Sequence, residues 1–304
     1  MNPKPPHSIL VASDLTSSSD GVLRAAVALA ALMDAELHVL HASELDVWAY
    51  GPEVAEALSP ADRLSAAERE LEEQLERTLR PGVEPASRQV VPGPAHLAIG
   101  ERAGETGADL IVLGPHRHQG PGDRLLGSTS DRVIRTIDVP CLIVRGRLSV
   151  PLRRVLVPLD LSDPALGALD VALAWCAALP AYEGDAPIEP TVIVLHVIPR
   201  VFDTDAFPIG KLGVGSALHD GVDAALARAG ATAAVEVREE VRWNDSATDE
   251  ILGVIEQEQA DLAVLGTHGR GAFGRALIGS VASGVARAAA CPVLLVPPAL
   301  WESS

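Results

Sequence analysis

The sequence predicts an α/β protein made of two consecutive domains, each a five-stranded parallel sheet with helices on both faces. Three observations predict this fold. Short aliphatic runs alternate along the chain with Ala- and Leu-rich helical stretches. Hydrophobic residues make up 48% of the 304 residues but aromatic ones only 3%, which suits helices packed on a buried parallel sheet. The same order of motifs also occurs twice in the chain.

The internal repeat is visible in four pairs of segments. SILVASDL recurs as RVLVPLDL, ELHVLHA as TVIVLHV, GADLIVLG as QADLAVLG, and VPCLIVRG as CPVLLVPP. The repeat places Asp14 opposite Asp160. We therefore expect two homologous domains, at 1–147 and 152–304, joined by a short linker.

The aliphatic runs are the expected strands. In the first domain they lie near 8–13, 36–42, 87–91, 109–113 and 140–145, and in the second near 154–159, 191–198, 234–241, 261–265 and 292–297. Residues 21–33 and 164–179 have the apolar spacing of helices. Strands that alternate with helices in this way are joined by right-handed crossovers, so the sheets are expected to be parallel.

The charged segment at 61–80 is expected to form a helix with an apolar stripe. The residues of this stripe are Leu64, Leu71, Leu75 and Leu79. A stripe of this kind marks either a partner interface or a helix that covers the sheet, and we favour the covering helix.

A second ambiguous segment is PIGKLGVGS at 208–216, which superficially resembles a phosphate-binding loop. The Walker motif requires Ser or Thr after its Lys, but Leu212 follows Lys211 here. We therefore expect this segment to be a flexible loop or a lid over a site.

Charge and cysteine content narrow the classes of function. A formal net charge of −17 opposes binding to nucleic acid or to anionic lipid. No apolar run is long enough for a transmembrane helix, so we expect no membrane insertion. The three cysteines are widely spaced and include no CxxC pair, which argues against a disulfide framework and a zinc site. With no signal peptide visible either, we expect a cytoplasmic protein.

The segment most informative about function is GTHGRGAFGRALIGS, which follows the fourth strand expected in the second domain. Gly266, Gly269, Gly279 and Ser280 have the spacing Gly-x2-Gly-x9-Gly-Ser. Glycines let a ligand approach backbone N–H groups, and such groups ahead of a helix N-terminus form a concavity for anions. Arg270 adds positive charge to the loop. The Ser280 hydroxyl either donates to a phosphate or caps the helix, and without further context the cap is favoured.

The first domain contains an altered copy of this loop, GPHRHQGPGDRLLGS. Gly114, Gly127 and Ser128 keep their places, but Arg117 stands where the second glycine would be. Either Arg117 turns outward and pairs with a phosphate, or this first site is empty and structural. His116 and His118 have no third ligand beside them, so we interpret them as exposed side chains rather than a metal site.

The position of the glycine motif in the predicted sheet also favours a ligand-binding site. Ligands of open parallel sheets bind beyond the carboxyl ends of the strands, where the strand order reverses. In the second domain these ends lie near Asp160, Val197 and Gly266. Together with the flanking segments DLAVLGTHGR and CPVLLVP, the arrangement resembles the universal stress protein family, with two such domains covering nearly the whole chain. The resemblance implies Rossmann-like or flavodoxin-like domains.

The resemblance also implies an adenine nucleotide, ATP or AMP, and leaves the presence of Mg²⁺ open. It implies Asp160 beside the nucleotide, backbone groups near Val197 at the adenine edge, and the glycine loop at ribose and phosphates. The implied binding residues are Asp160, Val197, Gly266, His268, Gly269, Arg270, Gly279, Ser280 and Val281, with Asp14, Gly114, Gly127 and Ser128 in the weaker first site. Without the resemblance, Asp160 would be interpreted as a turn residue ahead of Pro164.

Single-domain members of the family dimerise through their last strands. By resemblance, 141–145 and 293–297 are expected to pair across the halves as an internal pseudo-dimer, and a further homodimer of whole chains is left open. His41 and His196 each end the second strand of a domain. No carboxylate or nucleophile is placed by the sequence to complete a triad with them, so we expect structural histidines.

Three functions are compatible with these observations. The first is a regulatory nucleotide-binding module of a stress response, acting on a protein partner. The second is a slow ATP hydrolase or phosphotransferase, and the third is a scaffold that binds no nucleotide. We favour the first, because the second loop is intact and nothing resembles a Walker-B aspartate or a kinase catalytic loop. At most weak ATPase activity is expected.

Overall fold

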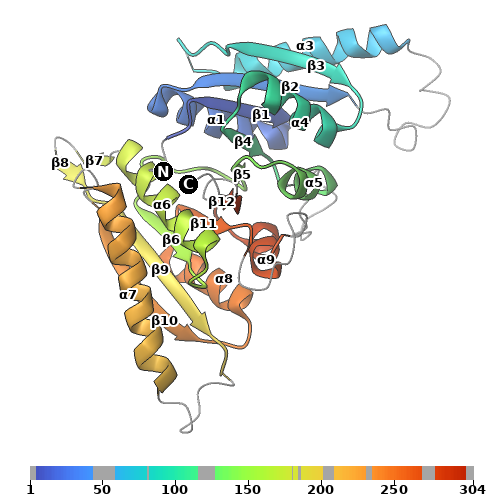
Figure 1. Ribbon diagram of the computed structural model, residues 1–304. Helices are drawn as coiled ribbons and strands as arrows, with labels where there is room; N and C mark the ends of the chain where they lie inside the picture. Colours follow the sequence, from blue (N-terminus) through green and yellow to red (C-terminus); the bar gives the residue numbers. More distant parts are fainter. Residues whose placement is uncertain are drawn as a thin grey trace. The chain divides into compact units, whose positions relative to one another are not determined.

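The computed structural model describes residues 5–43, 59–80, 82–115, 127–179, 181–183, 186–200, 209–230, 235–268 and 278–298. For 181–183, 186–187 and 209–212 the description covers the backbone alone. The chain divides into two compact units, an N-terminal unit of Pro6–Ile137 and a C-terminal unit that contains Asp138–Ser304. Figure 1 labels their helices and strands.

The N-terminal unit contains a parallel sheet in the order β4-β1-β2-β3. Its strands are β1 (Ser8–Ser13), β2 (Glu36–Ser43), β3 (Ser87–Pro92) and β4 (Leu110–Leu113). Its helices are α1 (Asp20–Met33), α3 (Pro60–Thr78), α4 (Ala95–Thr106) and α5 (Ser128–Thr136), with a short 3-10 turn at Ser17–Ser19. Helix α1 packs against α3, and α4 against α5 (Figure 1). Because the chain runs from β1 to β3 and then returns to β4, right-handed crossovers put these two pairs on opposite faces.

The C-terminal unit repeats this plan with the order β10-β9-β6-β11-β12. Its parallel strands are β6 (Arg154–Pro158), β9 (Thr191–Ile198), β10 (Glu236–Trp243), β11 (Leu262–Gly266) and β12 (Val293–Val296). The helices are α6 (Asp163–Ala178), α7 (Ile209–Ala229), α8 (Ala247–Glu258) and α9 (Ser280–Ala288). The α/β fold with parallel sheets and helices, expected from the repeat, is confirmed.

A sixth strand joins this sheet from the first repeat. Strand β5 (Cys141–Ile143) pairs antiparallel with β12, with Ile143 opposite Val293 and Cys141 opposite Leu295. The pairing of the two last strands, expected at 141–145 and 293–297, is therefore confirmed. It also explains why the C-terminal unit begins before the repeat does. The domain boundaries at 147 and 152 stay a prediction.

The repeated ADL motif has a structural role. Asp109 accepts hydrogen bonds from the backbone N–H groups of His7 and Ser8 at the start of β1. Asp261 accepts the equivalent bonds from Arg153 and Arg154 at the start of β6. Each carboxylate thereby aligns the start of the central strand with the strand that begins directly after the carboxylate, which is β4 in the first unit and β11 in the second.

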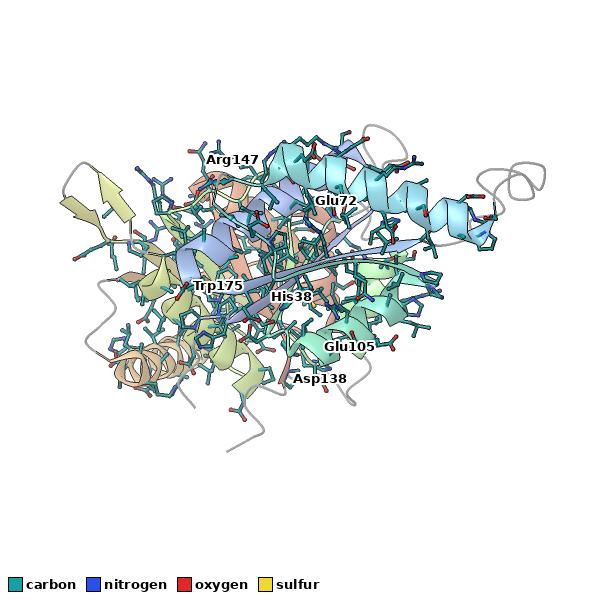
Figure 2. All side chains as sticks on the ribbon, turned by 90° about the horizontal axis from the view of Figure 1, so that it is seen from above. His38, Glu72, Glu105, Asp138, Arg147 and Trp175 are labelled. Atoms are coloured by element: carbon teal, nitrogen blue, oxygen red, sulfur yellow. The ribbon has the colours of Figure 1, made fainter. Side chains whose placement is uncertain are left out.

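The core of each unit lies along the central strands. Val11 in β1 and Val155 in β6 are fully buried, as parallel strands covered on both faces require. Figure 2 shows His38 on β2 and Trp175 on α6, which are only 7% and 3% exposed. Burial, and secondly the nearby Arg102 guanidinium, lower the pKa of His38. None of the described helices is long and apolar enough to cross a membrane.

Helix α3 covers the sheet, as expected from its apolar stripe. It packs on β2, β3 and α1, and Leu71 and Leu75 are buried. Ser59 caps its N-terminus by accepting from the Asp62 N–H group, and Pro60 starts the first turn.

The prediction of a loop at 208–216 is wrong, because α7 begins at Ile209 and contains Lys211. Leu218, Val222 and Ala225 are buried at helical spacing and anchor this helix on the sheet. That packing outweighs the low helix propensity of the glycines before it. The hairpin of β7 (Ala181–Glu183) and β8 (Ala186–Ile188) was not expected. It lies in an insertion that has no counterpart in the first repeat, so the repeat carries no signal for it.

The cysteines give the first testable prediction. Cys141, Cys176 and Cys291 are all buried, and burial raises the pKa of each thiol to about 12. At pH 8 only about one such thiol in ten thousand is a thiolate, which is the reactive form. We expect no reaction of the native protein with Ellman's reagent, and release of one equivalent per cysteine in urea. Rapid labelling of any thiol before unfolding would contradict this burial.

Candidate functional site

The candidate site lies at the carboxyl ends of β6, β9 and β11. Strand β6 is central, with β9 on one side and β11 on the other. The chain leaves β6 toward β9 and later returns to β11, so the strand order reverses between β6 and β11. Asp160 follows β6, Val197 is the next-to-last residue of β9, and Gly266 ends β11. The sheet thus brings these three sequence-predicted residues to one edge.

Asp160 organises the turn between β6 and α6. Its carboxylate accepts hydrogen bonds from the backbone N–H and the hydroxyl of Ser162. Leu161 between them has a φ of 62°, a left-handed conformation that costs a leucine about 1–3 kcal/mol. Helix α6 begins at Asp163, directly after Ser162, with Pro164 in its first turn. The turn role considered for Asp160 is therefore observed.

The same turn occurs in the first repeat. Thr16 donates its N–H and hydroxyl to Asp14, and Leu15 has the same φ of 62°. A strained leucine at the same place in both copies indicates that the turn conformation matters, because strain of this kind persists only when its surroundings require it.

The two histidines are structural parts of the same strand ends. The ring Nδ1 of His41 donates to the carbonyl of Ser13 at 2.9 Å, and that of His196 donates to the carbonyl of Leu159 at 2.6 Å. Each imidazole ties the end of the second strand to the end of the first. This fits the expected structural role.

The glycine loop begins in close contact with helix α6. A Cβ atom on Gly266 would lie 2.8 Å from the Pro164 carbonyl oxygen and 3.2 Å from the Ala165 nitrogen. Only glycine allows β11 to approach the first turn of α6 this closely. The contact brings the end of β11 next to the Asp160 turn.

The far end of the loop returns to the same place. The Gly279 N–H donates to the Thr267 carbonyl at 2.8 Å, and α9 starts at Ser280. Gly279 itself is the N-cap residue, so the interpretation of Ser280 as the cap is wrong. Ser280 is exposed and Val281 half-buried at the start of the helix. Gly269 and Arg270 lie outside the described residues.

The imidazole of His268 is hydrogen-bonded to the preceding residue, Thr267. Its Nδ1 atom lies 2.9 Å from the hydroxyl of Thr267, which is only 3% exposed. Its Nε2 atom is buried without a hydrogen-bond partner among the residues that the structure describes. Sequence reasoning had not selected Thr267, although the hydroxyl follows the strand-ending glycine directly.

Comparisons with known proteins agree with this architecture. The model of the "Universal stress protein family" matches residues 6–145 and again 151–297. The chain belongs to the universal stress protein family. It is 27% identical over 96% of its length to a universal stress protein of Mycolicibacterium smegmatis, of which the match covers 97%. It is 31% identical over 45% of its length to universal stress protein A homolog 1 of Coxiella burnetii, of which the match covers 94%.

Two solved structures share the fold over nearly the whole chain of this universal stress protein. One is a universal stress protein from Archaeoglobus fulgidus, with a TM-score of 0.63 and 20% identity over 96% of this chain and 98% of that chain. The other is a functionally unknown protein from Pseudomonas aeruginosa, with a TM-score of 0.64 and 18% identity over 96% of this chain and 93% of that chain.

The first copy of the site in this universal stress protein closes in the same way but with different contacts. The Gly127 N–H donates to the Pro115 carbonyl at 2.6 Å, and α5 starts at Ser128. The Ser130 hydroxyl donates to the carbonyl of Gly114, whereas the second copy has the buried Ala282 at that place. Arg117, His116 and His118 lie outside the described residues.

Gly114 is also less constrained than Gly266 in this universal stress protein. A Cβ atom on Gly114 would lie 3.4 Å from a methyl group of Val22, which is an ordinary contact.

We expect Gly266→Ala to lower the free energy of unfolding by about 1–3 kcal/mol, because the methyl group overlaps backbone atoms that cannot move independently. Gly114→Ala is the matched control and should change it by less than about 1 kcal/mol.

Urea titration followed by far-ultraviolet circular dichroism measures both variants, and the fluorescence of the buried Trp175 adds a probe of the C-terminal unit, which contains Gly266. Equal stability of the two variants would contradict a structural requirement for glycine at the end of β11.

Proposed function

We propose that this protein binds an adenine nucleotide, ATP or AMP, at the carboxyl ends of β6, β9 and β11, as a regulatory module of a stress response. The observation that carries the proposal is the closure of the glycine loop. Its two described ends, Gly266–His268 and Ile278–Ser280, meet through the Gly279–Thr267 hydrogen bond at the N-terminus of α9. The N-terminus of α6 abuts the same point through Gly266.

Two helix N-termini beside a glycine loop favour an anion. The first N–H groups of a helix have no partner within the helix, and the helix dipole adds partial positive charge there. A phosphate chain matches both features. Under this proposal, the glycine loop, Ser280 and Val281 hold the phosphates and ribose, and Arg270 adds a full positive charge.

The neighbouring strand ends would hold the remainder of the nucleotide. Asp160 would face the ribose, where its carboxylate can accept from hydroxyl groups while it keeps the Ser162 turn. Backbone groups at Val197 would recognise the adenine edge. Mg²⁺ is compatible with a triphosphate at this site. No group of three or more His, Cys, Asp or Glu side chains is arranged for a metal within the described parts of the chain, so the phosphates would have to supply ligands.

The first site is proposed to bind more weakly or not at all. Arg117 replaces the glycine that corresponds to Gly269, and a side chain there should block the approach of a phosphate to the backbone. Asp14, Gly114, Gly127 and Ser128 would then keep the shape of the fold rather than contact a ligand.

Location and assembly are part of the same proposal. The buried, unpaired thiols suit a reducing cytoplasm. We also propose that the β5–β12 pairing reflects an internal pseudo-dimer of the two repeats, and that occupancy of the nucleotide site alters contacts with a partner protein. A homodimer of whole chains is a further proposal that sedimentation can test.

The nucleotide content of the purified protein tests the central proposal. We expect that protein isolated without added nucleotide, then denatured and analysed by chromatography, releases about one adenine nucleotide per chain. About two per chain would contradict the asymmetry of the sites. An empty protein that also fails to retain ATP in equilibrium dialysis would overturn nucleotide binding.

Matched substitutions assign the site. Gly269→Arg copies the first loop into the second and should weaken ATP binding by about tenfold or more, since the side chain blocks backbone N–H groups. The control Arg117→Gly makes the reverse change in the first loop and should leave the affinity of the second site unchanged. Full-strength binding by Gly269→Arg would place the nucleotide elsewhere.

A further inference from the structure

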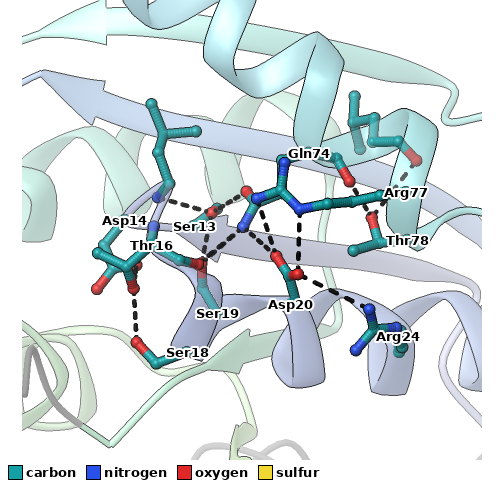
Figure 3. A network of polar contacts seen from close by, with 12 residues as sticks. Ser13, Asp14, Thr16, Ser18, Ser19, Asp20, Arg24, Gln74, Arg77 and Thr78 are labelled. Carbon is teal, nitrogen blue, oxygen red and sulfur yellow. Dashed lines mark hydrogen bonds and ion pairs between the residues drawn. The ribbon is translucent and has the colours of Figure 1, made fainter.

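A buried polar cluster lies beside the Asp14 turn in the N-terminal unit (Figure 3). We call it the Gln74 cluster, and its members are Ser13, Ser19, Asp20, Gln74 and Arg77. Gln74 comes from α3 and is fully buried, and Ser13, Ser19 and Asp20 are at most 8% exposed. Polar groups at this depth are tolerated only when they are hydrogen-bonded.

Gln74 is bonded at both ends of its amide group. The Ser13 hydroxyl donates to the Gln74 Oε1 atom at 2.6 Å. The Gln74 Nε2 group faces three acceptors, which are the Ser19 hydroxyl at 2.9 Å, the Asp20 carboxylate at 2.8 Å and the Thr16 carbonyl at 3.1 Å. One side chain of α3 therefore joins the end of β1 to the start of α1.

The Asp20 carboxylate anchors the cluster from the other side. Arg77 donates to it through Nε and a terminal nitrogen, at 3.1 and 3.2 Å. Burial raises the pKa of Asp20, but hydrogen bonds from Arg77 and Gln74 outweigh that effect and hold the pKa below its usual value. The carboxylate is thus charged at neutral pH.

The cluster reaches the strained residue of the turn. The N–H group of Leu15, the left-handed residue, donates to the Ser13 hydroxyl at 3.0 Å. The carbonyl of Thr16, the next residue, accepts from Gln74. The cluster is therefore bonded to the turn at two successive residues, Leu15 and Thr16, and Asp14 closes the same turn through Thr16.

The second repeat lacks this cluster although its turn has the same left-handed leucine and the same closing Asp. Arg228 of α7 pairs with Asp170 of α6, but this pair is not the equivalent of Arg77 and Asp20. Counted from the repeated Asp, the residue that corresponds to Asp20 is Leu166. Leu166 meets α7 at Gly221, where an added Cβ would lie 3.0 Å from a methyl group of Leu166. An apolar leucine thus takes the place of the Asp20 carboxylate, and a glycine faces it from α7.

The serines of the cluster are also replaced. Counted from the repeated Asp, Ser13 corresponds to Leu159 and Ser19 to Ala165, and both replacements are buried and apolar. In the second repeat, Leu161 is bracketed by the hydrogen bonds that Ser162 donates to Asp160.

We propose that the Gln74 cluster holds the Asp14 turn in its present conformation with or without ligand, whereas the Asp160 turn, which has no such cluster, opens more often until a ligand binds. The second clause rests on the proposed nucleotide site. The consequence is a division of roles between two similar turns. Only the Asp160 turn, next to Gly266 and the start of α6, would change with occupancy and signal it to a partner.

Hydrogen exchange of the full chain, measured by mass spectrometry without nucleotide, tests the first clause. We expect the peptide 13–20 to exchange about tenfold or more slowly than 159–166 relative to their intrinsic rates, since it has the additional bonds of the cluster. With saturating ATP, exchange of 159–166 should slow and that of 13–20 should stay the same.

Substitutions link this difference to the cluster. Gln74→Leu should accelerate exchange of 13–20 toward the rate of 159–166. A triple variant, Ser13→Leu with Ser19→Ala and Gln74→Ala, gives the two serine positions the residues of the second repeat and removes the amide. It should do the same without leaving the serine hydroxyls buried and unpaired. Arg24→Ala is the control, because its guanidinium is 57% exposed and 3.7 Å from Asp20, and exchange of 13–20 should not change.

Equal exchange of the two turns in the nucleotide-free protein would overturn the proposal, and this measurement needs no variant. Unchanged exchange of 13–20 in Gln74→Leu would overturn it as well, as would ATP that binds and slows both turns alike. If the nucleotide-free difference is found but dialysis detects no ATP binding, the role of the cluster is supported and the proposed nucleotide site fails.

Discussion

The backbone contact between Gly266 and the first turn of α6 is the constraint on which the site depends. At this point two elements that are distant in sequence approach too closely for any side chain, so the end of β11 and the Asp160 turn occupy one place. The loop that follows β11 must start there, and the hydrogen bond from Gly279 to Thr267 returns its end to the same point. The Gly266 contact and the Gly279–Thr267 hydrogen bond together bring both ends of the loop to two helix N-termini.

The two repeats show how a shared backbone can be stabilised in different ways. Both contain an Asp that closes a left-handed leucine turn, a His bonded to the end of the first strand, and an Asp that aligns the central strand. Around the first turn the interior is polar and hydrogen-bonded, and around the second it is apolar. Conserved geometry with different interiors is expected after duplication, since packing tolerates replacement when volume and polar partners are matched.

Much of the fold was predictable from local patterns. Aliphatic runs located the strands to within about two residues, because buried parallel strands have no polar face to interrupt them. The helix at 209–229 was not predictable, because glycines at 210, 213 and 215 resemble loop composition and only packing of Leu218 and Val222 on the sheet makes them helical. The hairpin at 181–188 is an insertion outside the repeat, which was the main guide to the architecture.

The sequence by itself determined the duplication, the parallel sheets, the strand ends that carry Asp160, Val197 and Gly266, and the difference between the two glycine loops. Those features depend on local periodicity and on comparison of one half with the other. Tertiary structure alone decided that Gly266 is required by α6, that Gly279 rather than Ser280 caps α9, and that Gln74 supports the Asp14 turn. Each of these depends on contacts between residues far apart in the chain, such as Ser13 and Gln74, for which a single sequence has no local signal.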